Sequence, residues 1–155
     1  MTLLEPWFRS RSRSITKSPK LYFNDTGVLL FLLAIHETPH LLASPLRGQI
    51  WETFAFAELR KQQLNRQGFW RLFFFRDRTL EVDFLLEQGN SFALFEAKWT
   101  EHPDLRDTAN LQAVAKVIGK QHVKEKAILC PTPVSFPLTS DVTALALKDV
   151  ADRVQ

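Results

Sequence analysis

Apolar positions recur at helical spacing in two long stretches of the chain. Residues 46–67 carry the longest pattern, which Gly68 follows as a stop signal, and residues 104–120 carry a second that ends at or near Gly119. A shorter helix is expected over Gly27 to Ile35, with Asp25 or Thr26 as its cap. A last short helix is predicted at 149–154. The apolar face of the longest helix is expected to comprise Ile50, Trp51, Phe54, Ala57 and Leu59.

Runs of β-branched and aromatic residues predict strands between these helices. Three follow in succession at 69–75, 81–86 and 92–99, and their short polar spacers, one of which contains Gly89, are typical of antiparallel hairpins. Further strands are predicted at 21–23, 127–130 and 142–147, whereas 36–45 and 131–137 are expected to be proline-containing connections. The order indicates an α/β fold with a mixed central β-sheet flanked by helices on both faces.

Length and composition narrow the class of protein to which the chain can belong. A chain of 155 residues with 45% hydrophobic content is the size of one domain with its own core. Its longest apolar run, about eight residues from Val28 to Ile35, is far below the roughly 18 that a membrane span needs. The single cysteine, Cys130, excludes an internal disulfide and a multi-cysteine zinc site. These features predict a cytoplasmic protein with no membrane partner.

The charge is mildly basic, +3 at pH 7, which is compatible with a polyanionic partner but also common in proteins that bind none. Five basic residues cluster near the N-terminus among serines: Arg9, Arg11, Arg13, Lys17 and Lys20. A solvated connector is favoured over a nucleic-acid contact for this run. The preceding residues, including Leu4 and Trp7, are expected to be extended and without a core pattern of their own.

Candidate catalytic residues lie on two neighbouring strands. Glu96 and Lys98 end the third strand of the meander two residues apart, so the strand period places both on one face. Asp83 interrupts an apolar run in the preceding strand, and a hairpin can bring it to Glu96. Two carboxylates with a backbone carbonyl, such as that of Ala97, form the oxygen environment that Mg²⁺ prefers. The alternative is an edge-strand ion pair between Glu96 and Lys98, worth about 0–1 kcal/mol.

The long helix offers a third acid. Glu52 shares its stripe with apolar side chains, whereas its rival Glu58 can instead pair with Lys61 one turn later. Gln112, on the following helix, can either approach these acids or face solvent, and the second is favoured. The four histidines lack metal-ligand spacing, and no serine stands in a nucleophile elbow. The chemistry indicated is metal-assisted phosphodiester cleavage, with Lys98 orienting water or offsetting charge.

These residues resemble a known superfamily. Gly48-x-x-x-Glu52, then Glu81-Val-Asp-Phe84, then Phe95-Glu-Ala-Lys98 is similar to the PD-(D/E)xK restriction-endonuclease-like proteins, which include archaeal Holliday-junction resolvases, over roughly residues 46–130. The resemblance implies that Glu52, Asp83, Glu96 and Lys98 map onto the acidic and basic positions of that superfamily. The chain departs from the literal motif because Val82 stands where the name has proline.

A second resemblance spans nearly the whole chain. Residues 17–27, 48–59, 74–77 and 81–84 resemble the uncharacterised C-terminal domain of prokaryotic AAA+ ATPases. In such proteins an ATPase module and a winged-helix segment come first. The resemblance therefore implies that residues 1–19 are the remnant of a connector and that residues 20–155 form the nuclease-like domain, with the ATPase module as its partner.

Two functions are carried forward. In the first, the domain cleaves DNA with Mg²⁺ or Mn²⁺, Glu52, Asp83 and Glu96 holding the metal while Lys98 positions the water. In the second, it is a catalytically silent module that binds DNA, the ATPase or another protein. The sequence does not indicate an oligomeric state.

Overall fold

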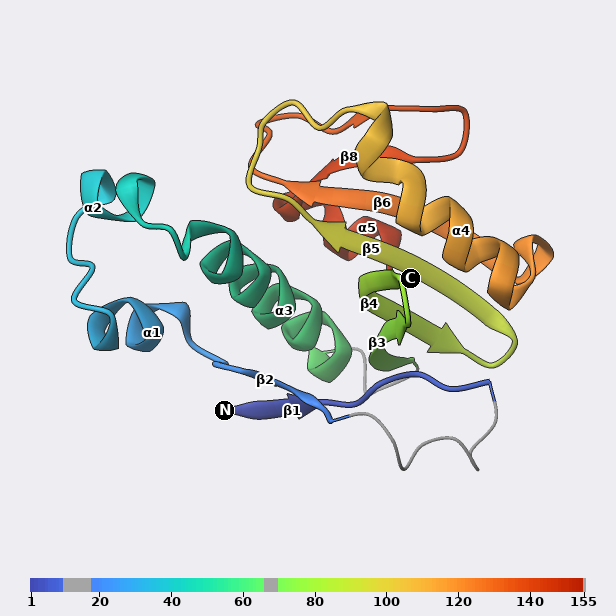
Figure 1. Ribbon diagram of the computed structural model, residues 1–155, viewed down its shortest axis with the longest axis horizontal. Helices are drawn as coiled ribbons and strands as arrows, with labels where there is room; N and C mark the ends of the chain where they lie inside the picture. Colours follow the sequence, from blue (N-terminus) through green and yellow to red (C-terminus); the bar gives the residue numbers. More distant parts are fainter. Residues whose placement is uncertain (10–17, 66–69, 155) are drawn as a thin grey trace.

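The fold is built on one six-stranded mixed sheet. The computed structural model describes residues 1–9, 18–65 and 70–154 (Figure 1). The strand order is β3-β4-β5-β6-β8-β7. The strands are β3 (Arg71–Asp77), β4 (Leu80–Gln88), β5 (Ser91–Ala97), β6 (Val123–Cys130), β8 (Thr143–Ala146) and β7 (Phe136–Pro137). Neighbours pair antiparallel from β3 to β5 and again between β8 and β7, and parallel from β5 through β6 to β8. The predicted mixed sheet and its three-strand meander are confirmed.

Strands β4 and β5 separate at one end. Their pairing runs from Gln88↔Ser91, beside the turn at Gly89, to Phe84↔Phe95. Beyond that point β4 still pairs with β3 as far as Leu80, and β5 still pairs with β6 as far as Ala97. The β3–β4 register shifts between Phe73 and Phe75, which is the signature of a bulge. The sheet therefore contains a fork between β4 and β5.

Helices cover both faces of the sheet, as predicted (Figure 1). Helix α3 (Arg47–Asn65) buries Phe56 and Leu59 in a core with Phe84 and Phe95. Helix α4 (Ala109–Ile118), preceded by a 3-10 turn at Leu105–Thr108, packs into a second core on the other face. Two details differ from expectation. Phe54 is 37% exposed, and the buried positions of α3 include Thr53, Ala55 and Phe56. The expected stop at Gly68 lies outside the described residues.

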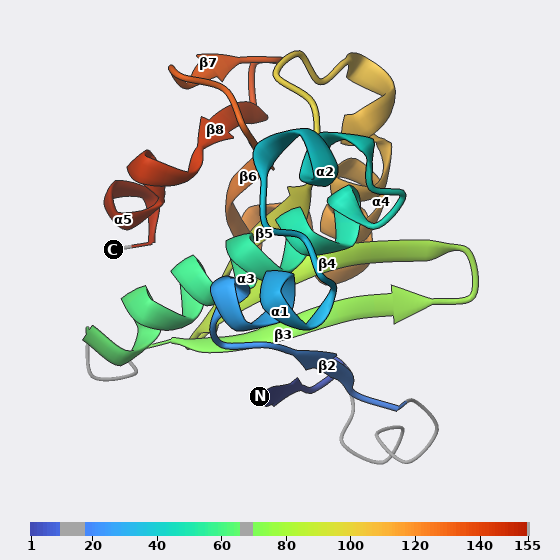
Figure 2. The ribbon, with the colours of Figure 1, turned by 90° about the vertical axis from the view of Figure 1, so that its left-hand side faces the viewer.

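A two-stranded ribbon precedes the sheet. Strands β1 (Thr2–Leu4) and β2 (Lys20–Tyr22) pair antiparallel beside β3 (Figures 1 and 2). Leu4 and Tyr22 are buried in the α3-side core, and the Trp7 ring packs against Phe75 and Phe92 on the other side. The part of segment 1–19 that the structure describes thus packs on the domain, although its sequence lacks a core pattern. Residues 10–17, which hold most of the basic run, lie outside the described residues.

Two short helices follow β2. Helix α1 (Thr26–Leu32) begins with Asp25 as its cap, whose Oδ1 accepts hydrogen bonds from the backbone N–H groups of Gly27 (2.7 Å) and Val28 (3.1 Å). Helix α2 (Thr38–Ala43) forms where only a connection was expected, because Pro39 lies in the first helical turn, where no N–H donor is needed. Both helices contact α3, and neither buries a residue in the described chain.

The C-terminal part completes the sheet. Gly119, with φ at +112°, ends α4 as predicted, and 3-10 turns at Lys120–His122 and Leu147–Asp149 precede β6 and α5 (Val150–Arg153). The expected connection at 131–137 contains the two-residue strand β7. Within the described ranges, no helix combines the length and the apolar character needed to cross a bilayer.

Candidate functional site

Asp83 lies in the fork between β4 and β5. Its Oδ2 accepts a hydrogen bond from the backbone N–H of Ala97 (3.0 Å), and its Oδ1 lies 3.2 Å from the ammonium of Lys20. The residue is 9% exposed. Burial, with the nearby charge of Glu52, raises the pKa of Asp83 even though Lys20 and the Ala97 N–H act in the opposite direction. The predicted strand acid is therefore a buried side chain between two separating strands.

Glu96 lies beside Asp83 and is 7% exposed. Its Oε1 lies 3.3 Å from the Nζ of Lys98, whereas its Oε2 is buried and has no hydrogen-bond partner among the described residues. Burial and the charge of Asp83 raise the pKa of Glu96 to about 8, against the lowering effects of Lys98 and of a hydrogen bond with the backbone of Asp83. The structure thus brings Asp83, Glu96 and Lys98 together, as the strand period and the hairpin spacing predicted.

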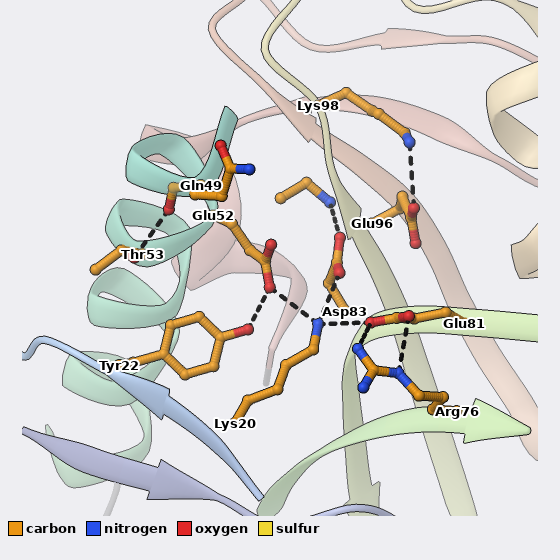
Figure 3. Close-up of polar contacts among 11 residues, drawn as sticks. Lys20, Tyr22, Gln49, Glu52, Thr53, Arg76, Glu81, Asp83, Glu96 and Lys98 are labelled. Atoms are coloured by element: carbon orange, nitrogen blue, oxygen red, sulfur yellow. Dashed lines mark hydrogen bonds and ion pairs between the residues drawn. The ribbon is translucent and has the colours of Figure 1, made fainter. Parts of the chain in front are cut away.

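The helix acid that joins them is Glu52. Its Oε1 accepts from the Nζ of Lys20 at 3.0 Å and from the hydroxyl of Tyr22 (Figure 3). Glu58, the rival position, forms an ion pair with Lys61 one turn along α3 and takes no part in these contacts. Glu52 therefore faces the same cluster as Asp83, although the cation and the hydroxyl that contact it come from β2.

Lys20 stands at the centre of the cluster, and sequence reasoning gave it no role in the site. Its Nζ contacts carboxylate oxygens of Glu52 (3.0 Å), Glu81 (2.8 Å) and Asp83 (3.2 Å). Burial lowers the pKa of Lys20, but the charges of Asp83 and Glu52 outweigh this effect and hold it above its ordinary value. Tyr22, two residues along the same strand, stacks on Phe56 with ring centroids 4.3 Å apart.

Glu81 extends the cluster toward solvent. The guanidinium of Arg76 donates to both of its oxygens, at 2.9 and 2.7 Å. Burial opposes the ionisation of Glu81, but the hydrogen bonds from Arg76 and Lys20 prevail and lower its pKa. Of the described side chains in these contacts, four are carboxylates (Glu52, Glu81, Asp83, Glu96) and three are cations (Lys20, Arg76, Lys98). When all four carboxylates are ionised, four minus three leaves one negative charge in excess, and the proton that Glu96 holds below its pKa of about 8 removes that excess.

The arrangement fits a metal ion in part. The unpartnered Glu96 Oε2 beside Asp83 is the kind of buried carboxylate oxygen that a cation completes. Glu52, however, is held by Lys20 and Tyr22, and no three His, Cys, Asp or Glu side chains of the described chain are grouped closely enough to hold a metal as they stand. Asp83 and Glu96 are thus the residues available to a divalent cation, with Glu52 available only after a change at Lys20.

One carbonyl ties this site to helix α3. Leu129 O accepts hydrogen bonds from the backbone N–H of Lys98 (3.0 Å) and from the indole N–H of Trp51 (2.9 Å). Trp51 also makes an edge contact with Trp99, with centroids 5.6 Å apart. The segment that carries Lys98 is therefore fixed both to β6 and to the helix that carries Glu52.

Gln112 does not approach the site. It bonds instead to Asp141 (2.9 Å) and Lys126 (3.0 Å), a polar group that joins α4 to β6 and to the loop before β8. Sequence reasoning gave no site role to Glu81 and Arg76. Lys20 and Tyr22, which it also missed, share one strand and are two residues apart, which is the same signal that singled out Glu96 and Lys98.

Comparison with known proteins gives one family. The family model described as "Domain of unknown function (DUF4143)" matches residues 47–150. Among curated proteins, an uncharacterised protein of Mycobacterium bovis and another of Mycobacterium tuberculosis are each 29% identical to this chain over 143 residues. The match covers 92% of this chain and 30% of each relative, so the chain spans about 30% of the length of these relatives. No solved structure matches the chain significantly.

Proposed function

The chain belongs to the DUF4143 family of domains of unknown function, and from this premise we propose that it cleaves DNA phosphodiesters with the help of a divalent cation. The fold proposed for it is the restriction-endonuclease-like one, in which α3 and the fork between β4 and β5 present the acids. One observation carries the proposal: Glu96 Oε2 is buried beside Asp83 without a partner among the described residues. A carboxylate oxygen left so is costly unless a cation or a proton completes it.

The roles of the side chains follow from their positions. Asp83 and Glu96 would hold Mg²⁺ or Mn²⁺, and Glu52 would join them if Lys20 moved. The cation supplies Lewis acidity at a phosphate oxygen and makes water more acidic. Lys98 is 38% exposed at the side chain, so its ammonium can reach both Glu96 and a phosphate oxygen at the mouth of the site. There it offsets the charge that develops as water adds to phosphorus and one ester bond breaks.

The proposed setting is a prokaryotic, cytoplasmic AAA+ ATPase with this domain at its C-terminal end. The resemblance of residues 17–27, 48–59, 74–77 and 81–84 to such domains supports it. The curated relatives are bacterial and much longer than the matched segment, which agrees with a domain that works within a larger protein. ATP hydrolysis would then move or open the DNA on which the site acts.

The test is cleavage of supercoiled, linear and branched DNA with Mg²⁺ or Mn²⁺, by the full-length protein that contains this domain. Asp83→Ala and Lys98→Ala are expected to lower the cleavage rate by about 100-fold or more. Glu58→Gln is the matched control, because Glu58 lies on α3 but pairs with Lys61 away from the site, and it should cleave normally. Absence of any cleavage that these two alanine variants abolish would contradict the proposal.

A second function is favoured by the position of Lys20. Its ammonium already forms ion pairs with both Glu52 and Asp83, as expected of a stable binding module without catalysis. Such a module would hold DNA, the ATPase or another protein through the same fold. Tight DNA binding that does not depend on a metal and is unaffected by Asp83→Asn would support this function over cleavage.

A further inference from the structure

We infer that Lys20 is a tethered cation that occupies the cation position of this site, so that a divalent metal binds there only by exchange with the lysine ammonium. The inference rests on the proposed function, since it concerns the metal that the proposed reaction uses. A residue of β2, which lies outside the central sheet, would then determine whether Glu52 of α3 and Asp83 of β4 can bind a metal.

The ammonium is fully engaged in the site. A lysine ammonium has three N–H donors and no acceptor. Lys20 Nζ lies within 3.2 Å of three carboxylate oxygens, one each from Glu52, Glu81 and Asp83. Its side chain is 17% exposed, and the Phe74 ring lies below the charge with its centroid 5.4 Å away. The ammonium is thus surrounded as a bound cation would be. It lies between Glu52 and Asp83, two of the acids that would hold the proposed metal.

Neighbouring contacts keep the ammonium in place. Tyr22 anchors β2 by stacking on Phe56 and by donating its hydroxyl to Glu52, and Leu4 of the partner strand is buried in the same core. The strand itself is therefore fixed, whereas the four-carbon stem of Lys20 can withdraw by rotation about its own bonds. Exchange thus requires a change of side-chain conformation without unfolding of the ribbon.

Charge arithmetic fits a one-for-one exchange. With Lys20 in place, four carboxylates face three cations. With all four carboxylates ionised and Lys20 withdrawn, they face Arg76 and Lys98, and four minus two leaves two negative charges, which one divalent cation neutralises. Asp83 and Glu52, whose carboxylate oxygens contact Lys20 Nζ, would line the vacated position.

The first test is Mn²⁺ binding, measured by calorimetry and by the electron paramagnetic resonance signal of free Mn²⁺. Lys20→Met keeps the length of the stem and removes the charge, so it is expected to bind Mn²⁺ at least about tenfold more tightly than the wild type. Lys20→Arg keeps a competing cation and should stay within about threefold of the wild type. Lys61→Met, which removes an exposed lysine paired with Glu58, is the matched control and should be unchanged.

The second test uses the unaltered protein and remains valid if Lys20→Met fails to fold. Acetylation of amines, followed by mass spectrometry, measures the reactivity of Lys20 with and without Mn²⁺. Exchange predicts that Lys20 is protected in the absence of metal and becomes several-fold more reactive as Mn²⁺ saturates the site. Lys61 should react at the same rate in both conditions.

The outcomes separate this inference from the proposed function. Equal Mn²⁺ affinity in the wild type and Lys20→Met, or Lys20 labelling that does not change while Mn²⁺ binds, overturns the exchange and leaves cleavage possible. Tighter binding in Lys20→Met without DNA cleavage supports the exchange and contradicts the nuclease. Absence of Mn²⁺ binding in both proteins overturns the two together.

Discussion

The backbone N–H of Ala97 donates a hydrogen bond to Oδ2 of Asp83 over 3.0 Å, just beyond the last β4–β5 pair. In a continuous antiparallel ladder such an N–H bonds to a main-chain carbonyl of the neighbouring strand. Here the Asp83 carboxylate takes that place and bridges the two strands as they separate. The same side chain therefore contributes to the fold and to the candidate site, and the two contributions can be measured apart.

Substitution of Asp83 separates its hydrogen bond from its charge. Asp83→Ala leaves the Ala97 N–H and the Lys20 ammonium without this acceptor, and is expected to lower the free energy of unfolding by about 2–3 kcal/mol. Asp83→Asn keeps an oxygen for the Ala97 N–H and removes a charge that burial disfavours, but it turns an amide NH2 toward the Lys20 ammonium. It should therefore lose less stability than Asp83→Ala. Urea denaturation at pH 7.5 measures both. An equal loss of unfolding free energy in the two variants would show that the negative charge of Asp83, and not its hydrogen bond from Ala97, stabilises the fork.

Tyr22 is expected to stabilise the domain through its hydroxyl as well as its ring. Tyr22→Phe keeps the stack on Phe56 but removes the hydrogen bond to Glu52, at an expected cost of about 1–2 kcal/mol. Tyr22→Leu also removes the ring stack and should cost about 1 kcal/mol more. Chemical denaturation of the two variants checks this order. A Tyr22→Phe variant as stable as the wild type would mean that water replaces the hydroxyl.

Glu96 should make stability depend on pH. Its pKa is about 8 in the folded protein against an ordinary value of 4.5, so the folded state holds a proton that the unfolded state has lost. Its contribution to stability is therefore complete below pH 4.5 and is lost as the pH rises through 8. Over this window the free energy of unfolding should fall with a slope of up to about 1.4 kcal/mol per pH unit.

The variant Glu96→Gln isolates this slope. It keeps the shape of the side chain and removes its titration, so the fall in stability between pH 5 and pH 8 should be largely absent. Glu58→Gln, at an acid outside the cluster, should keep the slope of the wild type. Thermal unfolding in buffers of equal ionic strength measures all three proteins. The same slope in all of them would assign the titration to another group.

Two glycines form a matched pair for the backbone. Gly119 has φ at +112°, and an added Cβ would lie 3.1 Å from Gln121 Nε2 and from His122 Cδ2. Gly119→Ala is therefore expected to destabilise the protein by about 1–2 kcal/mol. Gly48 lies in α3 with nothing within 4 Å of an added Cβ, so Gly48→Ala should be neutral or stabilise by up to about 1 kcal/mol. Midpoints of urea unfolding compare the two variants, and a reversed order would contradict this account.

Local patterns predicted most of the framework. The helical period over 46–67 and the three strand-type runs that end at Trp99 predicted the helix and the meander that position Glu52, Asp83 and Glu96. They could do so because a helix or strand that is buried on one face has apolar residues at regular intervals. The capping signal at Asp25 was also confirmed. Helix α2 differs from the predicted connection because Pro39 lies in the first turn, where proline is compatible with a helix.

Contacts between distant segments could not be predicted in this way. Lys20 meets Glu52 and Asp83 across separations of 32 and 63 residues, and no period within β2 records those partners. The parallel order of β5, β6 and β8 likewise depends on crossover connections that local patterns do not encode. Gln112 illustrates the same limit, since its actual partner Asp141 lies 29 residues further along the chain.

The carbonyl of Leu129 serves two donors, the indole of Trp51 and the backbone of Lys98. A displacement of α3 along its own axis would pull on this oxygen and on the backbone of Lys98, which bonds to it. Helices α1 and α2 rest on α3 while burying none of their own residues. A displacement of these two helices that moved α3 would therefore be transmitted to the segment of Lys98 by two routes, the shared Leu129 carbonyl and the contact between Trp51 and Trp99.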